Sequence, residues 1–331
     1  DEDGALLFRH VLSFLARVYL RGYLTAVLAE TNPDRVWPFW LEQQLDPGSP
    51  SYMPRGLPGL AINLTAVNWT AIGAPEFEQE AVIDPRGLLT PAPAGWSLDV
   101  FLHDENGALI PARLPADAVS QHTLDNAPVI VTRYRWHGLV VERTALATRP
   151  DACPVAVEVV TVRNGRNARP CRLYYAVRPY NPEGIGPVWE IACVNGRVLV
   201  NGRVGLCFDK APDLFVAAGE KEEDPVLNPL HAAETPRAAS RIGLATGLAV
   251  YDLSLAAGET AALTFVVPLA SILPALAHGV TDSMHPDPIG KARAYWARRK
   301  EEGLRLDLPD RRVQDWFEAN KAYLLVLTDG D

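Results

Sequence analysis

The feature that most constrains this chain is a long series of short segments in which apolar and polar residues alternate. The series runs from about residue 60 to residue 270, and a period of two residues is typical of half-buried strands. Glycine (24) and proline (28) are frequent and fall between the segments, where they favour turns. Because no helices alternate with these strands, the sequence predicts antiparallel sheets. We expect a mainly β fold, a large antiparallel supersandwich over residues 59–270, with helical segments at both ends.

Short sequences rich in glycine and asparagine predict where the chain turns. Asn-Gly dipeptides at residues 195–196 and 201–202 are typical of tight hairpins. Similar hairpins are expected at "DENG", residues 104–107, and at "WHG", residues 136–138. The longest alternating segment, "AINLTAVNWTAIG" at residues 61–73, predicts one long half-buried strand.

Residues 1–30 predict an apolar helix with one narrow polar stripe. The stripe residues, three or four positions apart, share one helix face: His10, Ser13, Arg17, Arg21 and Thr25. A helix that is apolar on most of its surface needs cover, so we expect it to pack into a groove of the fold or onto a partner. A lipid surface is the alternative. Four basic residues, Arg9, His10, Arg17 and Arg21, interrupt the apolar run and argue against a membrane partner.

The other end of the chain predicts a second apolar helix. Residues 31–58 are expected to be a proline-rich connector, residues 271–309 a helical linker, and residues 310–331 a final helix with Asp310 as its N-cap. Its apolar face contains Val313, Trp316, Phe317, Leu324 and Leu327. Few residues of the chain are left to cover this face. We therefore expect Trp316, Phe317, Leu324 and Leu327 to dock against a partner.

Charge and cysteine usage exclude several classes of function. The net charge is −9, whereas nucleic-acid binding requires a clustered basic surface, so we expect no nucleic-acid partner. Cys153, Cys171, Cys193 and Cys207 lack the spacing of metal ligands. Free thiols on strands are expected, and disulfide pairings stay open. The mixed-charge run at residues 220–224 predicts a solvated loop.

The sequence contains no recognisable catalytic motif. It has no nucleophile elbow, phosphate-binding loop, dinucleotide fingerprint or zinc-protease helix motif. We therefore assign no catalytic residue and expect neither a cofactor nor a metal. Three tryptophans, Trp69, Trp96 and Trp136, are candidates for an aromatic platform, although each lies in a strand pattern where core packing is the ordinary role.

The most distinctive segment is "VRPYNPEGIGPVWE", residues 177–190. Its prolines and glycines predict a stiff loop directly after a strand. Guanidinium, carboxylate and aromatic groups hold sugars through hydrogen bonds and stacking, and the same groups hold a long loop or a domain interface. Carbohydrate contact and interface packing therefore both remain open for its candidate residues, which are Arg178, Tyr180, Asn181, Glu183 and Trp189.

Taken in order, these segments resemble the N-terminal β-supersandwich of glucoamylase-like and glycogen-debranching-type glycoside hydrolases and of related phosphorylases. The resemblance rests on residues 68–73, 82–102, 177–188, 256–269 and the terminal segment 308–331. It implies a galactose-mutarotase-like sandwich fold. It also implies an (α/α)6 barrel behind the sandwich, of which residues 310–331 would form the first helix.

In enzymes of this kind the acid and base carboxylates lie in the barrel, so the resemblance transfers no catalytic residue to this chain. It implies a non-catalytic sandwich that supports a helical-barrel catalytic domain, with an oligo- or polysaccharide as the ligand. One alternative is a stand-alone carbohydrate-binding or structural surface protein whose terminal helices dock on another subunit. A second is a mutarotase-type enzyme that uses His122, His137 and Glu142. We expect no hydrolase activity from this chain.

Overall fold

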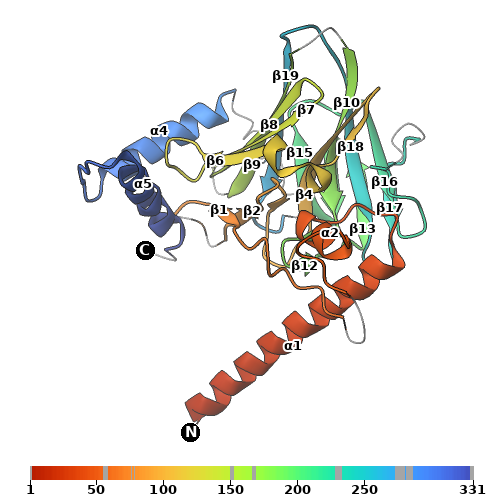
Figure 1. The fold of residues 1–331 in the computed structure, drawn as a ribbon, viewed down its shortest axis with the longest axis horizontal. Helices are drawn as coiled ribbons and strands as arrows, with labels where there is room; N and C mark the ends of the chain where they lie inside the picture. The colour runs from red at the N-terminus through yellow and green to blue at the C-terminus, as the bar shows by residue number, and fades with distance from the viewer. Residues whose placement is uncertain are drawn as a thin grey trace.

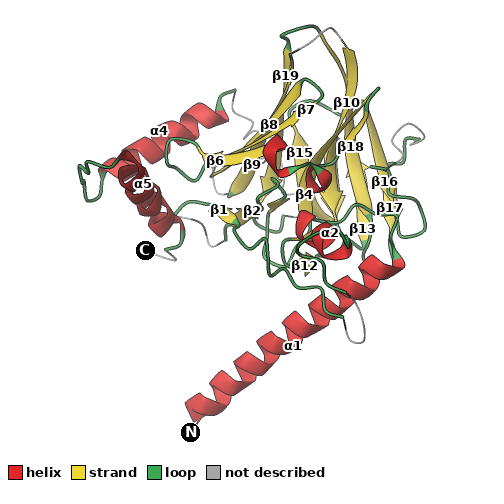
Figure 2. Cartoon of the chain, in the orientation of Figure 1, coloured by secondary structure: helices red, strands yellow, loops and turns green. Residues whose placement is uncertain are grey.

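The fold consists of two large antiparallel sheets packed face to face, with helices at the periphery (Figure 1, Figure 2). The computed structural model describes residues 2–54, 59–75, 77, 79–149, 153–165, 169–227, 233–272, 280 and 286–328. The predicted mainly β sandwich with helical ends is confirmed.

The first sheet has eight strands among the described residues. In spatial order they are β1 (Thr70–Ile72), β2 (Ala81–Ile83), β3 (Leu89–Thr90), β4 (Ser97–Asp104), β10 (Arg169–Arg178), β18 (Thr246–Leu255) and β16 (Leu214–Ala218), with β5 (Gly107–Leu109) paired to β4. The short helices η1 (Pro111–Arg113) and η2 (Ala116–Ala118) follow β5. A separate small hairpin joins β11 (Tyr180–Asn181) to β12 (Gly184–Ile185).

The second sheet has nine strands in the described part of the chain. Their order is β17 (Arg237–Ala239), β13 (Glu190–Val194), β14 (Arg197–Val200), β15 (Arg203–Phe208), β19 (Thr260–Pro268), β9 (Val155–Asn164), β8 (Leu139–Thr148), β7 (Ile130–Trp136) and β6 (Val119–Thr123). The pairs along this sheet and along the first sheet are antiparallel.

The predicted hairpins are confirmed. β4 turns into β5 at Asp104–Gly107, and β7 turns into β8 at His137–Gly138. The two Asn-Gly pairs join β13 to β14 and β14 to β15. Asn195 and Asn201 both have φ of 50°, a left-handed conformation that asparagine tolerates better than most residues.

The long strand predicted over residues 61–73 is wrong for most of its length, since only Thr70–Ile72 is a strand. The cause is the buried side chain of Asn63. Its carbonyl oxygen accepts from the backbone N–H of Ala66 at 2.9 Å, and its amide donates to the carbonyl of Pro182 at 2.9 Å. Asparagine thereby offers the backbone a local alternative to sheet pairing, and the segment lies against the 177–190 loop instead.

The main core lies between the two sheets and is built from the inward residues of both. Tyr175 of β10 and Phe265 of β19 stack across it, with ring centroids 3.6 Å apart and an interplanar angle of 6°. Alternate residues of β4, namely Leu98, Val100 and Leu102, point into this core, whereas Phe101 between them belongs to a second buried cluster. This alternation explains why the period-two pattern was so informative in the sequence.

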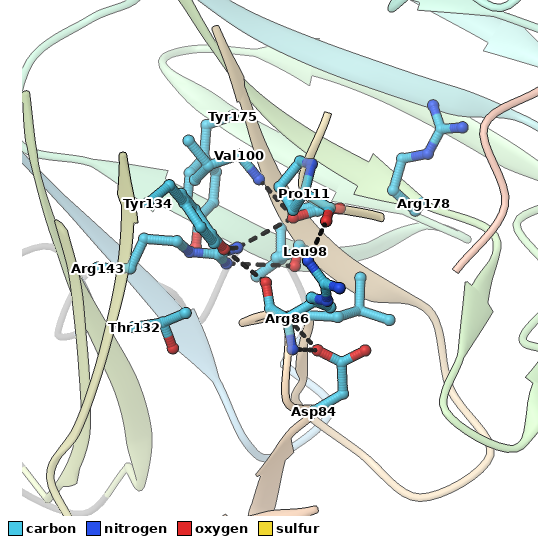
Figure 3. A network of polar contacts seen from close by, with 12 residues as sticks. Asp84, Arg86, Leu98, Val100, Pro111, Thr132, Tyr134, Arg143, Tyr175 and Arg178 are labelled. Carbon is cyan, nitrogen blue, oxygen red and sulfur yellow. Dashed lines mark hydrogen bonds and ion pairs between the residues drawn. The ribbon is translucent and has the colours of Figure 1, made fainter. Parts of the chain in front are cut away.

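A buried ionic network centred on Arg143 crosses this core (Figure 3). Arg143, on β8, donates to Glu158 on β9 at 2.7 Å and to Asp99 on β4 at 3.0 Å. The hydroxyl of Tyr175 donates to Glu158 at 2.6 Å. Because Asp99 and Tyr175 belong to one sheet and Arg143 and Glu158 to the other, the network joins the two sheets by charge as well as by packing.

Burial shifts the titration of two carboxyl groups near this network. It raises the pKa of Asp99 to about 7, although the charge of Arg143 opposes the shift. It also raises the pKa of Asp84 to about 6, against the hydrogen bonds that Asp84 accepts from the backbone N–H groups of Leu88 and Arg86.

Helices α4 (Pro288–Glu301) and α5 (Arg311–Val326) lie beside the second sheet (Figure 1). Trp296 of α4 and Val326 of α5 belong to one buried cluster with Leu146, Val157 and Val266 of the sheet. The predicted N-cap is confirmed, because the Asp310 carboxylate accepts from the N–H of Arg312 at 2.8 Å. The proline-rich connector 31–58 contains a short helix, α2 (Phe39–Leu45), which forms directly after Pro38, where proline is compatible with the start of a helix.

Helix α1 (Glu2–Thr31) projects from the body of the molecule (Figure 1). Near its C-terminal end, Ala26 and Ala29 pack into a cluster with Trp37 and Trp40. Further towards its N-terminus it exposes Val11, Leu12, Leu15, Tyr19, Leu20, Tyr23, Leu24 and Val27. The segment Val11–Thr31 is long and apolar enough to cross a membrane by length and composition alone, and 18% of its most apolar window is buried.

The raised pKa of Asp99 predicts a pH-dependent cost in stability. Because the folded-state pKa lies above that of an unfolded aspartate, its contribution is fully present below about pH 4 and is lost as the pH rises through about 7. Between about pH 4 and pH 7 the free energy of unfolding should fall by about 1.4 kcal/mol per pH unit for this group, and it should level off above that range. Asp99→Asn removes this titrating group. In urea unfolding, the free energy of unfolding of the variant should therefore rise relative to that of wild type as the pH rises.

The matched control is Asp252→Asn, which removes an exposed carboxylate that pairs with Arg172. Its unfolding free energy should run parallel to that of wild type over the same range. Parallel curves for Asp99→Asn as well would contradict the assignment of the shift to buried Asp99.

Candidate functional site

The 177–190 loop begins at the end of β10 and forms the small β11–β12 hairpin. Asn181 makes its tight turn, because the side-chain carbonyl accepts from the N–H of Glu183 at 2.8 Å. Gly184 follows with φ of 135°, which strains any residue with a side chain. A Cβ there would also meet the Thr25 hydroxyl of α1. The glycine therefore lets α1 approach the hairpin closely.

Arg178, the first candidate residue of the loop, is buried and works as a clamp. Its guanidinium donates to Asp224 at 2.9 and 2.5 Å, to the Thr246 hydroxyl at 3.1 Å and to the backbone carbonyl of Val36 at 2.9 Å. It also donates to the hydroxyl of Tyr180 at 3.1 Å. The clamp thus joins the first sheet, the connector after α1 and the segment that contains Asp224.

Asp224 completes the clamp from the other side. Its second carboxylate oxygen accepts from the backbone N–H of Val36 at 3.0 Å. Burial acts to raise the pKa of Asp224, but the charge and hydrogen bonds of Arg178 outweigh it and hold that pKa below its ordinary value. The solvated loop predicted over residues 220–224 is therefore wrong at its last position, although Lys221 and Glu222 are exposed as predicted.

The polar stripe of α1 explains how the helix attaches to this loop. Arg21 donates to the carboxylate of Glu183 at 2.7 Å and to the carbonyl of Ile185 at 3.1 Å. The Thr25 hydroxyl accepts from the N–H of Ile185 at 3.0 Å. Two of the five predicted stripe residues thus bind the hairpin, and Asn181 and Glu183 are held in place between α1 and the sheet.

A small pocket lies beside the hairpin. It has a volume of about 90 Å³ and is lined by Trp69, Glu80, Thr90, Asn181 and Glu183, with Val82, Pro93, Ala94 and Pro182. Trp69 is half-buried, and its indole N–H is already satisfied by the carbonyl of Ala66 at 2.9 Å. A ring face next to two carboxylates suits a sugar, which presents both C–H and hydroxyl groups.

The size of this pocket limits what it can do. Complete small-molecule sites usually measure roughly 300–1,000 Å³, so this pocket fits part of a sugar ring. Glu183 is already paired with Arg21. Among the described residues, no hydrogen bond joins Glu183 to Glu80. The arrangement offers an accessory contact and lacks the paired, separately tuned carboxylates of glycoside hydrolysis.

The structure divides the five candidate residues of the loop into three groups. Arg178 and Tyr180 are buried in the clamp, and Asn181 and Glu183 line the pocket. Trp189 is half exposed at the start of β13 and does not line the pocket. Sequence reasoning did not single out Glu80, which directly precedes β2, and it assigned Asp224 to a solvated loop.

The remaining candidates do not assemble into an active site. Trp96 and Trp136 pack against the main core, and the four cysteines are free thiols. His122 is exposed on β6 and His137 lies in the β7–β8 turn with φ of 46°. Glu142 instead pairs with Arg133 at 2.5 Å. Within the described ranges, no His, Cys, Asp and Glu side chains gather closely enough to hold a metal ion.

The predicted docking face of the last helix points to solvent. Trp316, Leu324 and Leu327 are 67%, 69% and 66% exposed, and Phe317 is half-buried. On the opposite side of α5, the smaller residues Ala322 and Val326 pack into the cluster with α4. Among the described residues, α5 therefore leaves its largest apolar side chains exposed and buries smaller ones.

The clamp predicts a large difference between two carboxylate deletions. Asp224→Ala leaves Arg178 buried without its counter-charge, which should cost about 3–5 kcal/mol of unfolding free energy. Asp252→Ala breaks an exposed ion pair with Arg172 and should cost at most about 1 kcal/mol. Denaturant unfolding of both variants measures the difference, and equal losses would show that the clamp has no special role.

Comparison with known proteins gives a likeness of fold. No protein-family model matches the sequence, and no curated protein sequence matches it. Among solved structures, the chain is similar to a bacterial glucoamylase complexed with acarbose, with a TM-score of 0.54 and 8% sequence identity. The match covers 79% of this chain and 41% of that chain.

Two further solved structures match more weakly. One is described as a kojibiose phosphorylase from human microbiome, with a TM-score of 0.34, 7% identity, and coverage of 82% of this chain and 33% of that one. The other is a family GH92 alpha-mannosidase from Bacteroides thetaiotaomicron, with a TM-score of 0.29 and 13% identity. That match covers 65% of this chain and 28% of that one. The TM-scores of these two structures are too low to support a conclusion about the fold. The chain has a fold found in a bacterial glucoamylase and spans less than half of that enzyme's length.

Proposed function

We propose that this chain is the non-catalytic β-sandwich part of a glycoside hydrolase-like protein and supports a helical-barrel catalytic domain. The observation that carries the proposal is the likeness to the bacterial glucoamylase, which covers most of this chain but 41% of the enzyme. The absence of a catalytic pair among the described carboxylates fits a supporting role.

The exposed apolar faces of the terminal helices support the same proposal. Val313, Trp316, Leu324 and Leu327 are exposed on one face of α5, at the helical spacing that buries a stripe against another helix. Contiguous exposed apolar surface of this kind marks an interaction site. A helical domain that packs against α5, and a partner surface along α1, would cover both.

We further propose that the Trp69 pocket contacts an oligo- or polysaccharide. The half-buried ring of Trp69 supplies a stacking face, and Glu80 and Glu183 supply acceptors for hydroxyl groups. The small volume suits one sugar ring at the edge of a longer chain whose main contacts lie in the catalytic domain.

The alternative is a stand-alone carbohydrate-binding or assembly protein, favoured by the exposure of α1 along much of its length. The reading frame downstream of the codon for Asp331 separates the two. The proposal expects further amphipathic helices in that frame, with carboxylates in the loops between them. A stop codon directly after Asp331 would overturn the supporting role and favour the alternative.

Activity and binding measurements on this chain should differ in outcome. We expect no release of reducing sugar from α-glucans, because no catalytic carboxylate pair is assembled among the described residues. We expect weak binding of maltooligosaccharides, lost in Trp69→Ala and unchanged in Trp189→Ala, which removes a half-exposed tryptophan outside the pocket. Isothermal titration checks the binding. Turnover of α-glucans by the chain would contradict the non-catalytic role. Equal binding by both variants would contradict the sugar contact at Trp69.

The docking face predicts a specific effect on surface hydrophobicity. The double variant Trp316→Gln, Leu324→Gln should lower the binding of a hydrophobic dye and leave the unfolding midpoint nearly unchanged, because both side chains are exposed. Val194→Gln, which removes a more isolated exposed apolar residue on β13, is the control. A large drop in the midpoint of the double variant would show instead that these residues stabilise the sandwich itself.

A further inference from the structure

A second surface feature lies on the outer face of the second sheet, away from the Trp69 pocket. It is a groove of about 360 Å³ lined by arginines of two strands, Arg133 and Arg135 on β7 and Arg163 on β9, together with Val140, Glu142 and Thr260. Further along the same strands, Leu146, Val157 and Val266 are covered by the cluster that includes α4 and α5. The helices thus cover one part of this face and leave the arginine part open.

The register of the sheet fixes the layout of the groove. Arg135, Val140, Arg163 and Thr260 lie side by side in one row across β7, β8, β9 and β19. Because neighbouring strands are about 4.8 Å apart, the Cα atoms of Arg135 and Arg163 lie roughly 10 Å apart. Val140 lies between them, and its short apolar side chain forms the floor.

The charges of this row are not balanced. Arg133 forms an ion pair with Glu142 across the neighbouring row at 2.5 Å. In the part of the chain that the structure describes, no carboxylate lies within ion-pair distance of Arg135 or Arg163, and both are exposed. The two guanidinium groups make a local positive surface on a chain of net charge −9. An anion bound between them would reduce their mutual repulsion.

We propose that this groove binds a saccharide that carries oxyanion groups, either phosphates or carboxylates, spaced roughly 10 Å apart. The Arg135 and Arg163 guanidinium groups each donate two hydrogen bonds to one oxyanion. The Thr260 hydroxyl donates to the same oxyanion as Arg163, and Val140 contacts the C–H face of the intervening sugar. Glu142 holds Arg133 and keeps its guanidinium from closing the groove.

The saccharide part of this ligand rests on the proposed carbohydrate function, whereas the oxyanion part rests on the arginines alone. Nucleic acid, another polyanion, needs a larger basic surface. The anion site is separate from the Trp69 pocket, since the two share no lining residue. One can therefore fail without the other.

The test is isothermal titration of the chain with four ligands at low and at physiological salt. The ligands are a phosphorylated oligosaccharide, an oligouronate, inorganic phosphate and a neutral maltooligosaccharide. The test variant is the double substitution Arg135→Ala, Arg163→Ala. The control, with the same loss of charge, is the double substitution Arg237→Ala, Arg241→Ala, which removes two exposed arginines elsewhere. The unfolding midpoints of both should match wild type, because all four side chains are on the surface.

The proposal expects the first double variant to lose about tenfold or more in affinity for at least one anionic oligosaccharide, a change of about 1.4 kcal/mol or more, because the bidentate contacts of two exposed arginines are removed. The control should keep wild-type affinity. A further double variant, Arg135→Lys, Arg163→Lys, should be intermediate because it keeps the charge but loses the bidentate geometry. The better of the two oligosaccharides identifies the oxyanion.

Three outcomes would overturn the proposal. If wild type binds neither anionic oligosaccharide, the proposed site does not exist. If the arginine variant and the control variant lose the same affinity, the binding is diffuse electrostatic attraction. Binding of inorganic phosphate as tightly as of the oligosaccharides removes the saccharide part. Binding of the neutral maltooligosaccharide should be the same in all variants, and its failure would instead count against the proposed contact at Trp69.

Discussion

The buried pair of Arg178 and Asp224 is the interaction on which the architecture around the candidate site depends. It is 1% and 0% exposed, and a charge at such a position is tolerated only when its partner and hydrogen bonds are present. The pair holds the connector at Val36 from both its N–H and its carbonyl. The position of α1, of the β11–β12 hairpin and of the pocket beside it all follow from this fixed point.

The Arg143 network complements this clamp at the centre of the sandwich. It fixes how the two sheets face each other, while the Arg178 clamp fixes what lies on the edge of the first sheet. Between them the sandwich becomes a rigid support with two apolar helices attached at separate places (Figure 1). Under the proposed function, this support presents the exposed faces of α1 and α5 to a helical catalytic domain and offers an accessory sugar contact at the Trp69 pocket.

The sequence predicted the strands and turns well where local chemistry decides the structure. The period-two pattern, the Asn-Gly pairs and the Asp310 cap act within a few residues, so they are visible in the chain. The segment around Asn63 was mispredicted because one buried side chain, bound to distant Pro182, replaced sheet pairing. Asp224 was taken for a solvated residue because its partner lies 46 positions away. The pocket likewise combines Trp69 and Glu80 with Asn181, which no sequence spacing could bring together.

Native-state hydrogen exchange at residue resolution tests the central claim most directly. If the clamp joins the connector and the hairpin to the sandwich, the amides of Val36 and Ile185 should exchange only through the same opening as the β10–β18 pair, with a similar free energy. Leu244, whose backbone carbonyl accepts from Arg35, should follow them. Fast exchange at Val36 and Ile185 with slow exchange in β10 would show that the connector and α1 open independently, and would contradict the account.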